Sequence, residues 1–219
     1  HYVRSYMLGR KARLVAREAH RKRGRLLDIG TGTGYFADTM ARRGWKVEAV
    51  EKSPQARAFA KEHFDLDVKP ESALQEFAPG SFDVITLWHV MEHLEHLNET
   101  WEMLRELLTE KGMLIVAVPN CSSYDAGRYG EYWAAYDVPR HLWHFTPVTI
   151  QQLASRHGFI MAARHPMPFD AFYVSMLSEK HRGSSCSFLK GMYAGTLAWF
   201  STLGRKERSS SMIYVFRKK

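Results

Sequence analysis

Cysteine is scarce in this sequence, and a long apolar run is missing. Only two of the 219 residues are cysteine, Cys121 and Cys186, which is too few for a disulfide framework and lacks the spacing of a metal-binding pair. The most apolar run, 188–203, contains Lys190 and is shorter than the ~20 residues that a membrane-spanning helix needs. We also find no signal-peptide pattern, so we expect a reducing, cytoplasmic setting.

Acidic residues are nearly absent from the start of the chain. Glu18 is the only one among residues 1–25, whereas that stretch holds nine lysines and arginines and the whole chain carries a formal charge of +8. Such a stretch is either a solvated helix face or an attraction site for an anionic partner. Because no nucleic-acid-binding motif accompanies the charge, we do not predict a nucleic-acid partner, although an RNA substrate stays open as an alternative.

The rest of the chain alternates strand and helix patterns. Apolar residues at helical spacing predict a lead-in helix over residues 2–22. The last strand, 211–217, is apolar and alternates weakly. Alternating strands and helices predict an open α/β sheet that binds ligands at the carboxyl ends of its strands. The strands that we expect before the last strand are 25–29, 46–50, 67–69, 81–88, 113–118 (after a turn at Lys111 and Gly112) and 159–164.

A glycine-rich turn follows the first predicted strand. Gly30, Gly32 and Gly34 alternate, and Tyr35 stands where a dinucleotide-binding turn would have its third glycine. Glycine allows a ligand to lie against bare backbone, and the following helix presents free N–H groups and the positive end of its dipole. The turn therefore predicts a small cofactor with an anionic group, other than a dinucleotide, which disfavours an NAD(P)-dependent oxidoreductase.

Four motifs in order resemble class I S-adenosylmethionine (SAM) dependent methyltransferases. The first is the turn itself, with Asp28 two residues before Gly30, and the second is Glu51 at the end of the next strand. The third, residues 82–94, closely resembles the F-D-x-I-x-x-x-x-V-L-E-H-L motif of a branch that includes the ubiquinone-pathway O-methyltransferases. The fourth, residues 137–146, is similar to the P-R-H-L-x-H-F-T/S segment of that branch.

This resemblance implies a cofactor site and a reaction. Glu51 would accept both ribose hydroxyls of SAM, a role that suits a carboxylate at the end of a strand because its two oxygens can bind a pair of donors. Asp28 would accept from the methionine ammonium or else stabilise the turn, Glu71 or Ser72 would contact adenine, and Trp88 and His89 would border the cofactor. S-adenosylhomocysteine would be the product. The implied cofactor-binding residues are Asp28, Gly30, Gly32, Gly34, Tyr35, Glu51, Lys52, Glu71, Ser72, Trp88 and His89.

Histidines gather around the third and fourth motifs. An imidazole with an ordinary pKa near 6.5 can take a proton from a hydroxyl or amine acceptor, so His89, His93 and His141 are the candidate catalytic residues. Ordinary packing and hydrogen bonding are an alternative role for them. Some quinone O-methyltransferases place a metal on E-x-x-E-H at positions 89–93, but His89 replaces the first glutamate here, and we predict no metal site.

The resemblance implies a Rossmann-like, mostly parallel sheet of seven strands, with an antiparallel last strand, helices on both faces and a small cap from insertions. We divide the chain into a basic amphipathic helix (1–23), a SAM-binding core (24–165), a cap or lid (166–208) and a final core strand (209–219). The aromatic cap either packs on itself or encloses a small or lipid-like acceptor. Residues 188–208 would lie on a membrane surface or pack in a dimer.

The resemblance favours oxygen over nitrogen or carbon as the atom that receives the methyl group, in a direct in-line transfer. A reaction of this kind needs alignment, desolvation and, where required, removal of a proton. Two other functions stay open at this point: an accessory protein that binds SAM without turnover, and an RNA methyltransferase.

Overall fold

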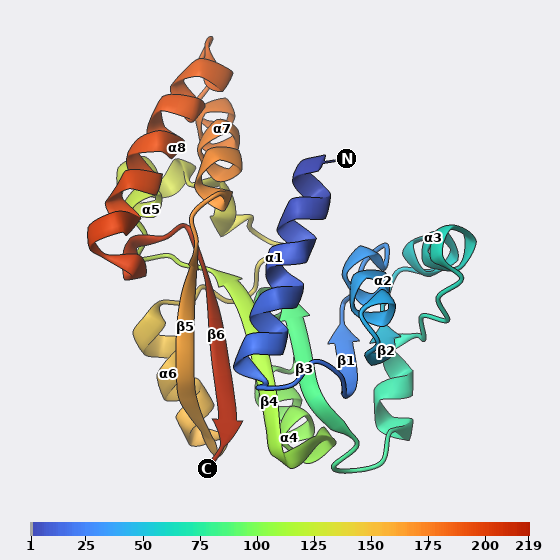
Figure 1. Cartoon of the computed structure of the whole chain (residues 1–219). Helices are drawn as coiled ribbons and strands as arrows, with labels where there is room; N and C mark the ends of the chain where they lie inside the picture. Colours follow the sequence, from blue (N-terminus) through green and yellow to red (C-terminus); the bar gives the residue numbers. More distant parts are fainter. Residues whose placement is uncertain (1) are drawn as a thin grey trace.

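One mixed sheet organises the chain, whose structure, a computed structural model, describes residues 2–219. The strand order is β2-β1-β3-β4-β6-β5. The first four of these neighbours run parallel, and β6 runs antiparallel to both β4 and β5 (Figure 1). The strands are β1 (Arg25–Ile29), β2 (Lys46–Val50), β3 (Phe82–Trp88), β4 (Leu108–Pro119), β5 (Phe159–Met167) and β6 (Ser211–Lys218).

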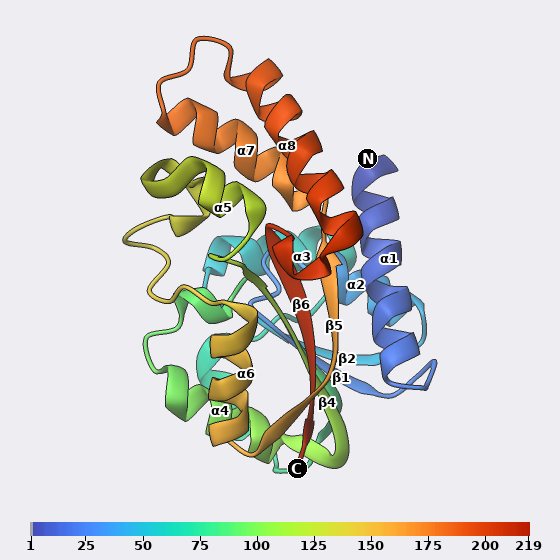
Figure 2. The same cartoon turned by 90° about the vertical axis from the view of Figure 1, so that its left-hand side faces the viewer.

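Helices cover both faces of the sheet because successive strand residues point to opposite sides. Leu26 and Val84 pack toward α1 and α2, whereas their neighbours Leu27 and Ile85 pack toward α4 and α6. All four side chains are buried, which contributes roughly 1.5–3 kcal/mol each. The predicted α/β fold with two helical layers is therefore confirmed (Figure 2). The helices are α1 (Tyr2–Glu18), α2 (Tyr35–Arg42), α3 (Pro54–Phe64), α4 (Leu97–Leu107), α5 (Tyr124–Tyr129), α6 (Pro147–Arg156), α7 (Asp170–His181) and α8 (Ser187–Gly204).

The expected count of seven strands is wrong, because the sheet has six strands over residues 2–219, although the expected antiparallel last strand is present as β6. Residues 67–69 form only an isolated bridge in which Lys69 pairs with Val50. The ladder stops there because Pro70 has no N–H to donate and a short 3₁₀ helix, Glu71–Glu76, begins at the next residue.

The expected turn at Lys111 and Gly112 is also wrong, since both residues lie inside β4. The pairing between β3 and β4 jumps from Phe82 opposite Leu108 to Val84 opposite Met113. Several residues of β4 therefore lie opposite a single residue of β3. The strand pairing is interrupted by an irregular bulge rather than by a turn.

Three helices form a cap above the carboxyl ends of the parallel strands. Figure 2 shows α5, α7 and α8 stacked beyond that edge of the sheet, with the N-terminal end of α1 beside them. Trp133 anchors this cap: its side chain is buried, and its Nε1 donates to Asp125 at 2.8 Å. Over residues 2–219, none of the helices combines the length and the apolar character needed to cross a bilayer.

Candidate active site

The glycine turn lies between β1 and α2, with all three glycines at positive φ. Gly30, Gly32 and Gly34 have φ angles of 66°, 58° and 81°, a region that other residues enter at a cost of roughly 1–2 kcal/mol. A Cβ on Gly30 would lie 2.5 Å from Val90 Cγ2, and a Cβ on Gly34 would lie 2.9 Å from Ala60 Cβ. A Cβ on Gly32 would meet no atom within 4 Å. The outer two glycines thus allow neighbouring side chains to pack closely against the turn, whereas the middle glycine borders open space.

Glu51 is held against this turn from the end of β2. Its Oε2 accepts from the Gly32 N–H at 2.8 Å, and its Oε1 accepts from the Ser53 N–H at 2.9 Å. Ser53 also caps α3, because its side chain accepts from the Ala56 N–H. The carboxylate is therefore fixed in orientation, and each oxygen keeps a lone pair for a further donor.

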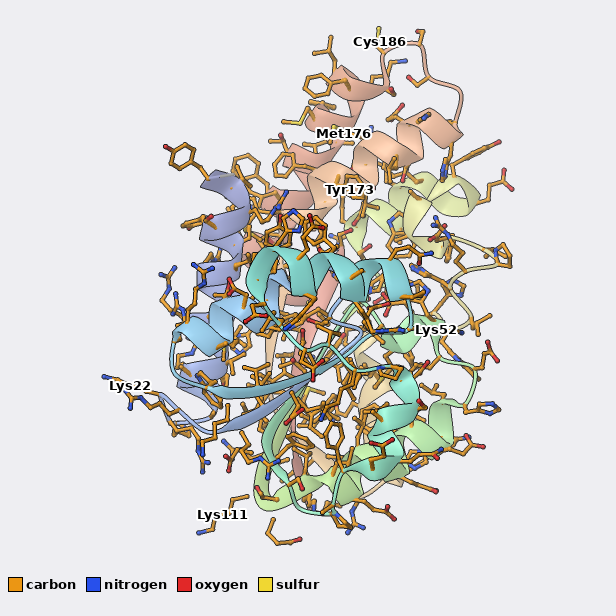
Figure 3. The ribbon with its side chains drawn as sticks, turned by 90° about the vertical axis from the view of Figure 1, so that its right-hand side faces the viewer. Lys22, Lys52, Lys111, Tyr173, Met176 and Cys186 are labelled. Carbon is orange, nitrogen blue, oxygen red and sulfur yellow. The ribbon has the colours of Figure 1, made fainter. Side chains whose placement is uncertain are left out.

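A cavity of about 650 Å³ opens beside this carboxylate. It lies at the carboxyl ends of β1, β2 and β3, where an open parallel sheet binds its ligands. Figure 3 shows Lys52, one of its lining residues, on this side of the molecule. We call it the cofactor-side cavity. The candidate cofactor residues that line it are Gly30, Glu51, Lys52, Glu71, Ser72 and His89.

Asp28 lies beneath the turn rather than on the cavity wall. Its side chain is buried, with Oδ1 accepting from Thr86 Oγ1 at 2.6 Å and Oδ2 without a hydrogen-bond partner in the described structure. Burial raises the pKa of Asp28 to about 6, although the nearby hydroxyls of Thr31 and Thr86 oppose the shift. A buried carboxylate oxygen without a donor is costly, so this site suits a cationic or N–H partner.

Neither of the two aromatic candidates lines the cofactor-side cavity. Tyr35 packs edge-on against Phe64 of α3, and the Arg4 guanidinium lies 4.3 Å from its ring centroid. Trp88 packs against Phe36 of α2, with the Lys11 ammonium 4.2 Å from its ring centroid. Both rings support the elements that shape the turn.

A second cavity, of about 1200 Å³, adjoins the first beneath the cap. Aromatic and aliphatic side chains of α1 and α7 form its walls, among them Tyr6, Phe172 and Leu177. Titratable side chains line it as well: Glu92, Asp137, His141, Asp170 and His181. We call it the acceptor-side cavity. His89 lines both cavities and thus lies at the boundary between them.

His89 is placed between two carboxylates. Its Nδ1 lies 3.4 Å from Glu92 Oε1, and its Nε2 lies 3.4 Å from Asp170 Oδ2. Burial lowers the pKa of the imidazole, but the close carboxylates of Asp170 and Glu92 outweigh burial and raise this pKa to about 9. His89 is therefore an imidazolium at neutral pH, and a protonated ring cannot accept a proton.

His93 and His141 face each other with their ring centroids 4.6 Å apart. Nδ1 of His93 lies 2.9 Å from the Arg140 carbonyl, and Nδ1 of His141 lies 2.8 Å from the Ala135 carbonyl. Because a carbonyl only accepts, Nδ1 of each ring is the donor in this contact, which leaves Nε2 of His141 to accept. Burial lowers the pKa of His141, which keeps this ring neutral.

Three of these side chains could hold a metal ion. Glu92, His93 and His141 each offer one ligand atom, and these atoms lie within 4.8 Å of one another. Glu92 is buried and neither of its oxygens has a hydrogen-bond partner in the described structure. Imidazole and carboxylate ligands suit a divalent transition metal. The arrangement differs from the E-x-x-E-H spacing, because His141 from a distant loop joins the group and His89 binds the two carboxylates.

Sequence reasoning missed Lys11 and Asp170. Lys11 lies one helical turn from both Met7 and Val15 on the apolar side of α1, and that charge within an apolar stripe was its only signal. Burial lowers its pKa, whereas the nearby carboxylates of Asp170 and Asp28 oppose the shift. Asp170 begins α7, and no motif marks it, because it meets His89 only through the folding of the cap.

A family model and several named relatives match this chain. The methyltransferase domain family matches residues 1–163. An enzyme named ubiquinone biosynthesis O-methyltransferase from Caulobacter sp. (strain K31) is 36% identical over 103 residues, covering 44% of this chain and 41% of that protein. Its namesake from Cereibacter sphaeroides (strain KD131 / KCTC 12085) is 30% identical over 158 residues, covering 67% of this chain and 64% of that protein. The chain thus spans less than two thirds of these relatives.

Solved structures share the fold. A putative sarcosine dimethylglycine methyltransferase from Galdieria sulphuraria superposes with a TM-score of 0.67 at 17% identity, covering 99% of this chain and 86% of that one. A SAM-dependent methyltransferase from Archaeoglobus fulgidus superposes with a TM-score of 0.65 at 18% identity, covering 98% and 94%. Identities this low carry the Rossmann-like architecture and nothing finer.

Proposed function

Because this chain belongs to the methyltransferase domain family, we propose that it binds SAM and transfers the methyl group in line to the oxygen of a small or lipid-like acceptor. The observation that carries the proposal is the Glu51 carboxylate, bonded to the Gly32 N–H at 2.8 Å beside the cofactor-side cavity. SAM, when bound, supplies a methyl group already activated on a sulfonium. The protein then needs to bind, orient and desolvate rather than to provide a nucleophile.

Each cofactor-binding residue contacts a different part of SAM or supports the turn. Glu51 accepts from the ribose hydroxyls, Glu71 or Ser72 contacts adenine, and Asp28 attracts the methionine ammonium. The empty space beyond Gly32 and the unpartnered oxygen of Asp28 both fit such a guest. Gly30 and Lys52 line the same cavity, whereas Gly34, Tyr35 and Trp88 fix the shape of the turn.

The acceptor enters the larger cavity. A volume of about 1200 Å³ exceeds the usual ~300–1000 Å³ of small-molecule sites and leaves room for an apolar tail. Tyr6 of α1 and Phe172 of α7 favour such a tail, while the polar end of the acceptor lies near His89. In this scheme residues 24–165 with 209–219 form the SAM-binding core, apart from α5, which joins residues 166–208 in the cap, and the basic helix closes one side.

His141 removes the proton from the acceptor hydroxyl. Its Nδ1 is fixed on the Ala135 carbonyl, its Nε2 is free to accept, and burial lowers its pKa. His93 supports the orientation of His141 through ring contact. His89, as an imidazolium, attracts the oxyanion that develops as the proton leaves.

Titration calorimetry with SAM and S-adenosylhomocysteine tests the cofactor assignment. We expect wild-type protein to bind both, and Glu51→Gln to weaken binding by roughly tenfold or more, because one charge-assisted contact to the sugar is lost. Glu48→Gln on the same strand is the matched control, since Glu48 pairs with Lys69 outside the cavity. A wild-type protein that binds neither nucleoside would end the proposal. Transfer of a radiolabelled methyl group to a quinol-type phenol then tests turnover.

The cap also makes peripheral contact with a membrane through residues 188–208. This part of the proposal rests on the exposed large apolar side chains of α8 and on Arg205, Lys206 and Arg208 at its end.

A further inference from the structure

A small basic cavity lies in the cap, separate from the two cavities of the candidate active site. Its volume is about 410 Å³. Arg128 comes from α5, Glu179 from the end of α7, and Lys190 and Tyr193 from α8, while Arg182 and Ser184 lie in the loop between α7 and α8. Neither the cofactor turn nor the histidine cluster contributes to it.

The three cations of this cavity have no carboxylate partner. In the part of the chain that the structure describes, none of Arg128, Arg182 and Lys190 forms an ion pair. Glu179 is buried and its Oε1 accepts from the Tyr129 hydroxyl at 3.1 Å. Ser184 Oγ is shielded from solvent and has no hydrogen-bond partner in the described structure. The cavity thus offers guanidinium, ammonium and hydroxyl donors, the set that phosphate binds in proteins.

In the segment around this cavity, residues 180–206, all lysine, arginine, aspartate and glutamate positions are basic. Between Glu179 and Glu207 the sequence has no acidic residue, whereas it has Lys180, Arg182, Lys190, Arg205 and Lys206. Each lysine or arginine near an anionic leaflet contributes about 1 kcal/mol of attraction. The charge of the cap therefore matches an anionic surface.

Helix α8 turns its small residues inward and its large apolar residues outward. A Cβ on Gly191 would lie 2.5 Å from Met176 Cα, and a Cβ on Gly195 would lie 2.8 Å from Phe172 Cα, so α7 and α8 pack backbone to backbone. The opposite stripe follows helical spacing, with exposed fractions of 68% for Leu189, 62% for Tyr193 and 55% for Phe200. A helix that is apolar on its outer face suits contact with an apolar medium.

Tyr193 belongs to both features, because it lines the basic cavity and stands in the exposed stripe. We propose that the α7–α8 hairpin lies on an anionic bilayer, with the α8 stripe at the boundary of the acyl chains and the Arg128–Arg182–Lys190 cavity holding the phosphate of one phospholipid headgroup. The inference rests on the proposed use of a lipid-like acceptor and deepens it by naming the surface from which that acceptor is drawn.

Co-sedimentation with vesicles tests the headgroup site. Wild-type protein should bind vesicles of phosphatidylglycerol and phosphatidylcholine much more tightly than vesicles of phosphatidylcholine alone. Arg182→Glu with Lys190→Glu should weaken binding to the anionic vesicles by about tenfold or more. Lys22→Glu with Lys111→Glu makes the same change of charge at the end of the molecule opposite the cap and should bind like wild type (Figure 3). Equal binding by both double variants would overturn the inference.

A probe on Cys186 gives a second readout. Cys186 is exposed in the loop at the tip of the hairpin (Figure 3), and Cys121→Ser removes the other thiol. An environment-sensitive dye at Cys186 should shift to the blue with anionic vesicles, and Leu189→Ser with Leu203→Ser should abolish the shift. A dye that stays in water while the protein sediments would contradict the placement of α8.

Two further measurements distinguish a free phosphate from a lipid headgroup, and membrane binding from SAM binding. Titration with inorganic phosphate that saturates the cavity, combined with no binding to anionic vesicles, would assign the site to a free anion and overturn the lipid assignment. Calorimetry with SAM should be unchanged in the Arg182→Glu, Lys190→Glu variant, while Glu51→Gln should still bind vesicles. Loss of vesicle binding therefore contradicts the membrane site, whereas loss of SAM binding contradicts the proposed methyltransferase function.

Discussion

His89 Nε2 and Asp170 Oδ2 lie 3.4 Å apart, which links the end of β3 to the first turn of the cap helix α7. The contact lies at the boundary between the cofactor-side and acceptor-side cavities. Asp170 also stands at a helix N-terminus, where a carboxylate is stabilised by the helix dipole. The pair therefore positions the cap over the core.

Replacing Asp170 by Asn should loosen this attachment. We expect the KM for the acceptor to rise and the free energy of unfolding to fall by about 1–3 kcal/mol, because a charged hydrogen-bond partner is lost. The affinity for SAM should change little, since Asp170 does not line the cofactor-side cavity. Asp67→Asn, at an exposed position, is the control. A variant with the wild-type KM and melting temperature would show that the contact does not hold the cap.

The three glycines of the turn should respond differently to alanine. Gly34→Ala should lower the free energy of unfolding by roughly 1–3 kcal/mol, because its Cβ would lie 2.9 Å from Ala60 in addition to the strain of a φ of 81°. Gly32→Ala should destabilise the fold less, since its Cβ meets no atom within 4 Å, yet it should weaken SAM binding. Denaturant unfolding and calorimetry on both variants provide the comparison; the reverse order of effects would exclude a ligand next to Gly32.

Asp28 predicts a pH dependence of both binding and stability. Its pKa in the folded protein is about 6, above the ordinary value of 3.8. SAM affinity should fall as the pH decreases through about 6, because a protonated carboxyl no longer attracts an ammonium group. Stability should run the other way: the contribution of this group is present below pH ~4 and is lost as the pH rises through about 6.

The Asp28→Asn variant checks these two signs. It should bind SAM weakly at every pH and should melt at the wild-type temperature or higher at pH 8, because no buried charge remains. Thermal melts and calorimetry between pH 5 and 8 measure both effects. If the variant bound SAM with unchanged affinity, Asp28 would be a turn-stabilising residue only.

His141→Gln should reduce the rate of methyl transfer by about 10²–10⁴-fold, the usual loss when a general base is removed, without changing SAM affinity. His144→Gln is a suitable control, because His144 is exposed and its ring contacts Tyr136. Dialysis against a chelator separates the two roles open to this cluster. Retained wild-type activity agrees with a base, whereas a loss that added divalent ions restore would assign Glu92, His93 and His141 to a metal instead.

The sequence predicted most of the core because its signals are local. Strands β1 and β2 begin and end as expected, and Ser53-Pro54 and Thr146-Pro147 mark the starts of α3 and α6 through cap and first-turn preferences. The lengths of the third predicted strand and of β4 depended on pairing with distant partners, which a single sequence does not display. For the same reason Lys69 looked like part of a strand and forms only a bridge.

Sequence motifs located the cofactor side of the site better than the acceptor side. The motif residues Gly30 and Glu51 follow neighbouring strands, so their meeting follows from the parallel order β2-β1-β3. By contrast, the contact of His89 with Asp170 and the meeting of His141 with Glu92 depend on the cap and on loop 121–145. Loops and caps follow no short-range sequence pattern from which these contacts could be predicted.

The position of the two chain ends has a practical consequence. Tyr2 and Val3 line the acceptor-side cavity, whereas Lys219 lies at the far end of the sheet from α7 and α8 (Figure 1). A purification tag joined ahead of Tyr2 would therefore crowd this cavity. Immobilising the protein on a sensor chip through Lys219 would instead leave the cavity clear of the attachment point.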